Sequence, residues 1–299
     1  MINNQFIDLH THSNNSDGEF TPEQLIDIAY KNNVGILSIT DHDSISGLDE
    51  FKRSISHDMI GVKGIEFSSF IMDNNEKIKL HILGYCFDEN NYLFHSLVNE
   101  MREKRIDKHL QLLRDIKEKI KIIPEEEIEK LNIEKYCWFD REVISCLEKA
   151  KYPNEIIDEV RNYYKINRFS YGRDYDLDVR RVIDAVHLSG GYVVLAHPMA
   201  YRFSNDKDKV LRIINQLIQM GIDGVEIYQS DCLRADTLWL DKNIHESHLL
   251  YSVGSDFHGI KNSDGRQIGL GINSNLCIRE TSLTNDIIKT KKYFKEVKS

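Results

Sequence analysis

The stretch from Asp8 to Ser13 constrains this chain most, because it places two histidines, His10 and His12, one residue apart. It follows a short apolar run and therefore predicts the end of a first β-strand. Side chains on a strand alternate between its faces, so both histidines would point the same way. Two neutral imidazoles on one face can bind a divalent metal. Alone, such a pair is more often core packing, so the interpretation depends on partners from later segments.

Apolar runs and helical patterns alternate along much of the chain. We expect the later strands at residues 36–40, 60–65, 78–85, 192–196, 224–228 and 249–253, and helices at 21–33, 46–54, 207–220, 235–246 and 284–297. Strands that alternate with helices indicate parallel βα units, and runs that are apolar throughout indicate burial on both faces. The pattern therefore predicts an α/β fold in which seven strands close into a barrel.

Residues 91–186 break this alternation. Helical patterns cover residues 101–121, 141–149 and 153–164, and we find no convincing strand among them. We therefore predict an inserted helical subdomain at 91–186, which acts as a lid or substrate-binding element. The barrel would comprise residues 1–90 and 187–299.

Polar residues follow the expected strands. In barrels of parallel strands the chemistry gathers at the C-terminal strand ends. Nine nitrogen and oxygen ligands would meet there, which is too many for one ion and suits two or three metals. Singly, each has a structural explanation, such as a helix cap for His42 or a turn for His197. Their joint convergence favours a metal site made of His10, His12, Asp17, His42, Glu66, His81, His197, Asp256 and His258.

Charge and cysteine usage limit the function. The formal net charge is −9, from 39 basic and 48 acidic residues, which argues against a general nucleic-acid surface. A nuclease is not excluded, because bound metals add positive charge locally. The five cysteines are far apart and form no Cys-x-x-Cys motif, which is typical of reduced thiols. With no signal-peptide pattern and no apolar run long enough for a bilayer, we expect a cytoplasmic protein.

The motifs together resemble the PHP (polymerase and histidinol phosphatase) family. They are the Asp8–Ser13 stretch, Thr40-Asp41-His42-Asp43, Gly64-Ile65-Glu66, Ala196-His197-Pro198 and Gly254-Ser255-Asp256-Phe257-His258. The resemblance spans residues 5–90 and 185–275. It is greatest to the small bacterial phosphoesterases that act on nucleoside 3′,5′-bisphosphates or short RNA 5′ ends.

This resemblance implies a distorted seven-stranded (β/α)7 barrel and a trinuclear site of Mn, Fe or Zn. It places His10, His12, Glu66 and Asp256 on a first metal. Glu66 would bridge to a second metal held by His81 and His197, and Asp17, His42 and His258 would hold a third. A hydroxide bridging two metals would attack phosphorus. Asp41, Asp43 and His258 are the expected catalytic residues, with Asp41 or Asp43 orienting a ligand histidine through its second nitrogen.

The residues expected to contact substrate depart from the pattern of that subgroup. Where the subgroup usually carries an Arg-Pro-His-type motif, this chain has Asp140-Arg141-Glu142. Where the subgroup usually has an arginine three residues after the histidine of the Ala-His-Pro motif, this chain has Ala200. The expected phosphate contacts are Arg102, Arg105, Arg141 and Arg202, although for the first two a solvated helix face is the more common role. Tyr171, Tyr175 and Tyr201 would either stack on a base or pack in the core.

We therefore predict a metal-dependent phosphoesterase that hydrolyses a phosphate monoester of a small phosphorylated metabolite or nucleotide. The alternatives are an exonuclease on short RNA or DNA, a histidinol-phosphate-type phosphatase and, ranked last, a non-catalytic metal-binding scaffold. The expected partners are two to three divalent ions and a small phosphorylated substrate, with no membrane and no stable nucleic-acid partner.

Overall fold

The computed structural model describes residues 4–55, 59–120, 144, 147–148, 151–167, 176–260 and 265–295. The chain divides into two compact units. We call Met1–Leu97 with Leu177–Ser299 the barrel unit, and Val98–Asp176 the helical unit. The mixed α/β class predicted from the sequence is confirmed.

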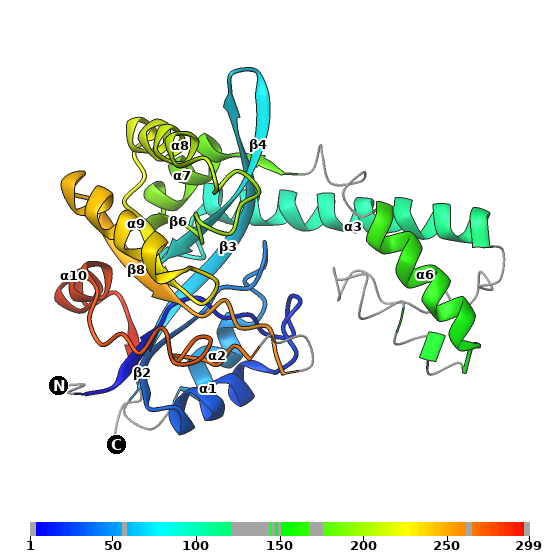
Figure 1. Ribbon diagram of the computed structural model, residues 1–299. Coiled ribbons are helices and arrows are strands. Elements are labelled where there is room, and N and C mark those ends of the chain that lie inside the picture. Colours follow the sequence, from blue (N-terminus) through cyan, green and yellow to red (C-terminus); the bar gives the residue numbers. More distant parts are fainter. Residues whose placement is uncertain are drawn as a thin grey trace. The chain divides into compact units, whose positions relative to one another are not determined.

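One sheet organises the barrel unit (Figure 1). The two ends of its longest strand path meet, because the backbone N–H of Leu9 donates to the carbonyl of Val253 at 3.0 Å. Thr11 also forms a parallel bridge with Phe257. The path runs β1 (Phe6–Asp8), β2 (Val34–Ile39), β3 (Ile60–Asp73), β4 (Glu76–Tyr85), β6 (Tyr192–Leu195), β7 (Gly224–Gln229) and β8 (Leu250–Gly254), while β5 (Leu177–Asp178) and β9 (Phe294–Lys295) pair with β3.

Strand β4 runs antiparallel to both of its neighbours, β3 and β6. The expectation of parallel βα units was therefore wrong for this strand. The β3–β4 link is a two-residue turn in which Asn74 and Asn75 have φ of 49° and 66°. Asparagine tolerates this left-handed backbone, and so short a turn can join only antiparallel strands. This hairpin distorts the barrel away from a regular β/α alternation.

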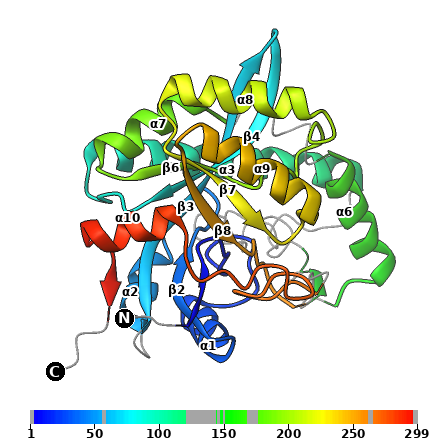
Figure 2. The ribbon, with the colours of Figure 1, turned by 60° about the vertical axis from the view of Figure 1, so that its left-hand side comes forward.

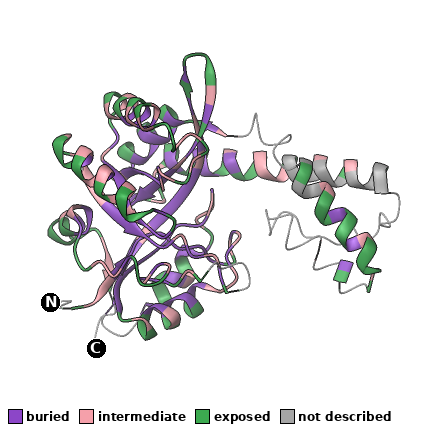
Figure 3. Ribbon diagram, in the orientation of Figure 1, coloured by how far each residue is buried: buried purple, intermediate pink, exposed green. Residues whose placement is uncertain are grey.

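Helices cover the outside of the barrel unit (Figure 2). The first helix, α1, begins where its sequence predicts. Thr21 caps it and forms a capping box with Gln24, and Pro22 occupies the first helical position. Figure 3 shows the central strands buried while the helices expose their outer faces. These helices are α1 (Pro22–Lys31), α2 (Leu48–Ser54), α7 (Val179–Leu188), α8 (Lys207–Met220), α9 (Arg234–Glu246) and α10 (Ser282–Thr290).

Some boundaries differ from those expected. Strand β5 and helix α7 belong to the barrel unit, although residues 177–186 were placed in the insertion. The expected C-terminal helix to residue 297 was wrong: α10 ends at Thr290 because Lys291 adopts φ 57°, and β9 follows. Helix α3 (Tyr92–Ile120) begins in the barrel unit and continues into the helical unit, which also contains α6 (Asn154–Asn167). Most of the helix expected at 141–149 lies outside the described residues.

Apolar side chains from successive strands fill one core cluster, including Ile7, Val62, Leu83, Val194 and Val253. This core supports the strand ends that carry the polar motifs. None of the described helices combines the length and apolar character that crossing a bilayer requires.

Candidate metal centre

The barrel unit brings the predicted ligand side chains together in three overlapping groups. Within each group the nitrogen and oxygen atoms lie within 4.8 Å of one another. The groups share His12, His42 and Glu66. Their members are His10, His12, Glu66 and Asp256; His12, Asp17, His42 and His258; and His42, Glu66 and His81.

The first group joins the beginning and the end of the barrel. His10 Nε2 lies 3.4 Å from Glu66 Oε2 and 3.4 Å from Asp256 Oδ1. His12 Nε2 lies 3.3 Å and 3.2 Å from the same two oxygens. Two imidazole nitrogens and two carboxylate oxygens that face one another form a set of donors suited to a divalent cation.

Both oxygens of Glu66 are surrounded by imidazoles. Its Oε1 lies 3.0 Å from His81 Nδ1 and 3.0 Å from His197 Nε2. Its Oε2 also lies 3.0 Å from His42 Nδ1. His42 was expected only beside Asp17 and His258, so its approach to Glu66 links two of the expected groups.

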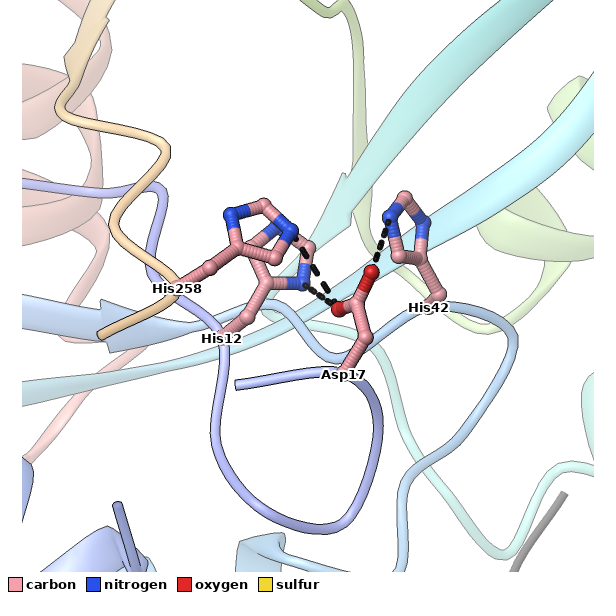
Figure 4. A group of neighbouring side chains, drawn as sticks. All are labelled: His12, Asp17, His42 and His258. Atoms are coloured by element: carbon pink, nitrogen blue, oxygen red, sulfur yellow. Dashed lines mark ion pairs between the residues drawn. The ribbon is translucent and has the colours of Figure 1, made fainter. Parts of the chain in front are cut away.

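The remaining group gathers around Asp17, in the loop after β1 (Figure 4). Asp17 Oδ1 lies 3.2 Å from His258 Nε2 and 3.7 Å from His12 Nδ1, and its Oδ2 lies 3.8 Å from His42 Nε2. His258 Nδ1 lies 2.9 Å from the carbonyl oxygen of Asp256, which can only accept a hydrogen bond. The Nδ1 of His258 therefore carries the proton, and its Nε2 lone pair faces the group.

The residues fit bound metal. Among the described residues, His10 Nε2, both ring nitrogens of His12 and Glu66 Oε2 are buried without a hydrogen-bond partner. Buried polar atoms usually have partners, so such a concentration of unsatisfied atoms indicates a missing ligand. The donors are imidazoles and carboxylates without thiolates, which suits divalent metal ions.

Burial and opposite charges set the protonation of the group. Burial alone would lower the pKa of His12, but the nearby carboxylates of Asp256 and Glu66 raise it to about 10. Burial would likewise raise the pKa of Glu66, but the charges of His42 and His10 hold it well below its usual range. These carboxylates attract cations, and divalent metals compete with the protons for the same nitrogen atoms.

The aspartates expected to orient a ligand histidine make other hydrogen bonds. Asp41 accepts from the backbone N–H of Ser13 at 2.7 Å and from the hydroxyls of Ser13 and Ser16 at 2.6 and 2.5 Å. It thereby fixes the loop that carries Asp17. Asp43 accepts from the backbone N–H of Ser68 at 2.7 Å.

Two residues that the sequence analysis missed contact the group. Glu226 on β7 lies against His10, and Arg266 donates to both the carbonyl and Oδ2 of Asp256, at 2.8 and 2.9 Å. Arg266 therefore leaves Oδ1 of Asp256 turned towards His10 and His12. A lone carboxylate inside the apolar 224–228 run was the available signal for Glu226; nothing in the sequence singled out Arg266.

The expected substrate contacts are spread over both units. Arg102 is exposed and Arg105 half-buried on α3, both in the helical unit. Arg202 is exposed in the loop after β6. The Tyr201 hydroxyl accepts from the backbone N–H of His81 at 2.8 Å and donates to the Ala196 carbonyl at 3.0 Å, which supports two strand ends. Arg141, Tyr171 and Tyr175 lie outside the described residues.

Comparisons with known proteins identify the family of this chain. The family model described as "PHP domain" matches residues 8–227. A 5′-3′ exoribonuclease of Escherichia coli is 28% identical over 84% of this chain and 84% of its own length. A phosphoribosyl 1,2-cyclic phosphate 1,2-diphosphodiesterase of Eggerthella lenta is 29% identical over 84% of this chain and 94% of its own length. A 3′,5′-nucleoside bisphosphate phosphatase of Chromobacterium violaceum is 25% identical over 88% of this chain and 90% of its own length.

Among solved structures, one described as an amidohydrolase from Chromobacterium violaceum matches with a TM-score of 0.72. It is 20% identical and covers 97% of both chains. At this identity the match supports the fold alone.

Proposed function

This chain belongs to the PHP domain family, and from that premise we propose that it is a metal-dependent phosphoesterase. It hydrolyses a phosphate monoester of a small phosphorylated metabolite or nucleotide. The observation that carries the proposal is the buried group of imidazoles around Glu66, in which His10, His12 and Glu66 hold unsatisfied donor and acceptor atoms. All nine predicted ligand residues lie in or beside this group.

We assign two or three divalent ions, Mn, Fe or Zn, to the three overlapping groups. When bound, such ions lower the pKa of coordinated water and neutralise charge on the oxygens of a phosphate ester. Glu66 would contact more than one ion, because its two oxygens face different histidines. Asp256 and Asp17 would add negative charge to each end of the site, so the ligands balance much of the charge that the ions bring.

The open side of the group indicates where substrate approaches. The side chains of His10, His12 and Glu66 are fully buried, whereas those of Asp17, His81 and His258 are 37%, 36% and 27% exposed. A phosphate ester would therefore enter over the exposed side chains and reach the ions from that side. The buried side chains would stay fixed and dry, which strengthens electrostatic interactions within the site.

The non-reacting part of the substrate needs fixed cations or polar groups that hold it in place. We propose Arg102, Arg105, Arg141 and Arg202 for this role, and we propose that the helical unit sets substrate choice. Replacing Arg202 with alanine should raise KM about tenfold or less with little change in bound metal. A loss of metal in this variant would place Arg202 in a structural role instead.

The second candidate function is a 5′-3′ exoribonuclease, and it is favoured by the identity to the Escherichia coli enzyme of that name. The acidic net charge of −9 disfavours long polyanionic substrates, so the monoester of a small nucleotide comes first.

The experiment compares kcat/KM at full metal loading for a nucleoside 3′,5′-bisphosphate, a 5′-phosphorylated oligoribonucleotide, a cyclic phosphodiester and histidinol phosphate. We expect the bisphosphate to be hydrolysed most efficiently, and Glu66→Gln to abolish turnover of every substrate. Preference for the oligoribonucleotide would support the second candidate. No turnover of any substrate by the metal-loaded protein would contradict the phosphoesterase assignment.

A further inference from the structure

Glu226 is a fully buried carboxylate on β7, the one strand of the seven-strand path that supplies no predicted ligand. Its Oε1 lies 3.0 Å from His10 Nδ1, and its Oε2 accepts the backbone N–H of His197 at 2.8 Å. A buried carboxylate is costly unless hydrogen bonds compensate for lost water. Each oxygen of Glu226 has one such partner, and each partner belongs to a segment of the metal centre.

The bond to His10 determines how that imidazole can act. A neutral histidine has one protonated nitrogen and one lone pair. Because Glu226 favours the proton on Nδ1, the lone pair of His10 lies on Nε2. That nitrogen is the one that faces Glu66 and Asp256, at 3.4 Å from each carboxylate. Glu226 therefore selects the tautomer in which His10 can donate to a metal.

The bond to His197 acts on the backbone. His197 has φ 26°, which is a sparsely populated conformation for a residue other than glycine. Such a conformation persists only where its surroundings hold it in place. The Glu226 bond fixes the His197 N–H while the ring places Nε2 3.0 Å from Glu66 Oε1.

Packing leaves this arrangement little freedom. A Cβ at Gly254 would overlap both the Cβ of His10 and Oε1 of Glu226. The backbone of β8 therefore packs directly against the His10–Glu226 pair, and both side chains are fully buried.

We propose that Glu226 is a positioning residue. It holds His10 in the tautomer whose Nε2 lone pair faces Glu66 and Asp256, and it fixes the backbone N–H of His197. It thereby couples the group around His10 to His81 and His197, the two imidazoles beside Oε1 of Glu66. This inference rests on the proposed metal centre. Both partners of Glu226 are hydrogen-bond donors, and a carboxylate offers an acceptor to each. A glutamine of the same size has one acceptor and one donor, so it can satisfy only one partner.

The experiment compares wild type, Glu226→Gln and a matched control, Asp73→Asn. Asp73 is also a buried carboxylate, but it pairs with Arg212 on α8. Manganese affinity is measured by competition with a chelator. Exchangeable histidine N–H resonances are recorded by proton NMR after cobalt substitution, because paramagnetic cobalt shifts the signals of its ligands.

We expect Glu226→Gln to bind manganese about ten- to a hundredfold more weakly and to lose or shift one exchangeable resonance. Asp73→Asn should match wild type in both measurements. If Glu226 only fills space, the isosteric glutamine will leave affinity and resonances unchanged, and the inference is overturned.

A second variant covers the case in which Glu226→Gln does not fold. Glu226→Asp keeps two acceptor oxygens on a shorter side chain, so we expect weaker manganese binding than wild type and a retained exchangeable resonance. Affinity equal to wild type in this variant would also overturn the inference. If wild type itself binds no manganese or cobalt, the proposed metal centre fails, which is a different result from an insensitive Glu226 variant.

Discussion

The backbone N–H of Ser255 donates to Oδ1 of Asp8 at 2.9 Å, and this bond joins the first and last strands of the barrel path across 247 positions of sequence. Asp8 also accepts from the backbone N–H groups of His10 and Gly269, at 3.2 and 2.7 Å. The carboxylate thus holds the His10–His12 segment against the segment that carries Asp256. Asp8 therefore helps to bring candidate ligands from the first and last strands of the path into one group.

Asp8→Asn should therefore destabilise the barrel. The amide keeps one acceptor and turns an N–H₂ donor towards a backbone donor, which leaves a buried group unsatisfied. We expect a loss of about 1–3 kcal/mol in the free energy of unfolding, measured by urea denaturation. Asp27→Asn, at an exposed position of α1, is the control and should change stability little. Equal stabilities of the two variants would show that Asp8 does not secure the closure.

Glu66→Gln tests the shared carboxylate. Glutamine keeps the size of the side chain but removes its charge and introduces a donor among five imidazoles. We expect bound metal and phosphate-ester hydrolysis to be lost together, with a circular dichroism spectrum like that of wild type. Wild-type turnover in this variant would remove Glu66 from the site.

Gly254→Ala tests the close approach of β8 to His10. The added methyl group would overlap His10 and Glu226, so we expect metal affinity to fall by about tenfold or more. Gly190→Ala separates this effect from backbone strain, because Gly190 has φ 77° and no described atom within 4 Å of an added Cβ. It should cost about 1 kcal/mol of stability and leave metal affinity unchanged. Similar metal affinities in both variants would refute the close-packing explanation.

The ion pair between Asp73, at the end of β3, and Arg212 should make the free energy of unfolding depend on pH. Hydrogen bonds from Arg212 hold the pKa of Asp73 below its ordinary value of 3.8. The folded state therefore favours the charged carboxylate, and its contribution is present above pH 3.8 and lost as the pH falls through the lower pKa of the folded state. Urea denaturation of wild type and Asp73→Asn should show a constant difference at neutral pH that shrinks below about pH 4. A difference that grows on acidification would have the wrong sign for this ion pair.

The gathering of the candidate ligand residues could be predicted from the sequence because each motif is local. A short apolar run that ends in His10, His42 or Asp256 identifies a strand end, and barrel geometry brings strand ends together. The direction of β4 could not be read in this way, because the same apolar pattern suits parallel and antiparallel neighbours. Only the Asn74–Asn75 turn carried that information.

The residues that position the site were harder to predict. Glu226 acts on His10 and on His197, which lie 216 and 29 positions away, so no local pattern reveals the pair. Asp41 lies in a recognisable motif beside His42, yet its carboxylate binds the Ser13–Ser16 loop. Adjacency in sequence predicted a histidine partner, whereas the fold directs the side chain to another segment.

The most direct test of the account is a titration of metal-free protein with manganese, in which bound metal per chain and hydrolysis of a nucleoside 3′,5′-bisphosphate are measured in the same samples. The overlapping groups around Glu66 predict that two to three ions bind per chain and that turnover appears only as these sites fill. Full turnover in chelator-treated protein, or no turnover once two or more ions are bound, would contradict the assignment of this chain as a metal-dependent phosphoesterase.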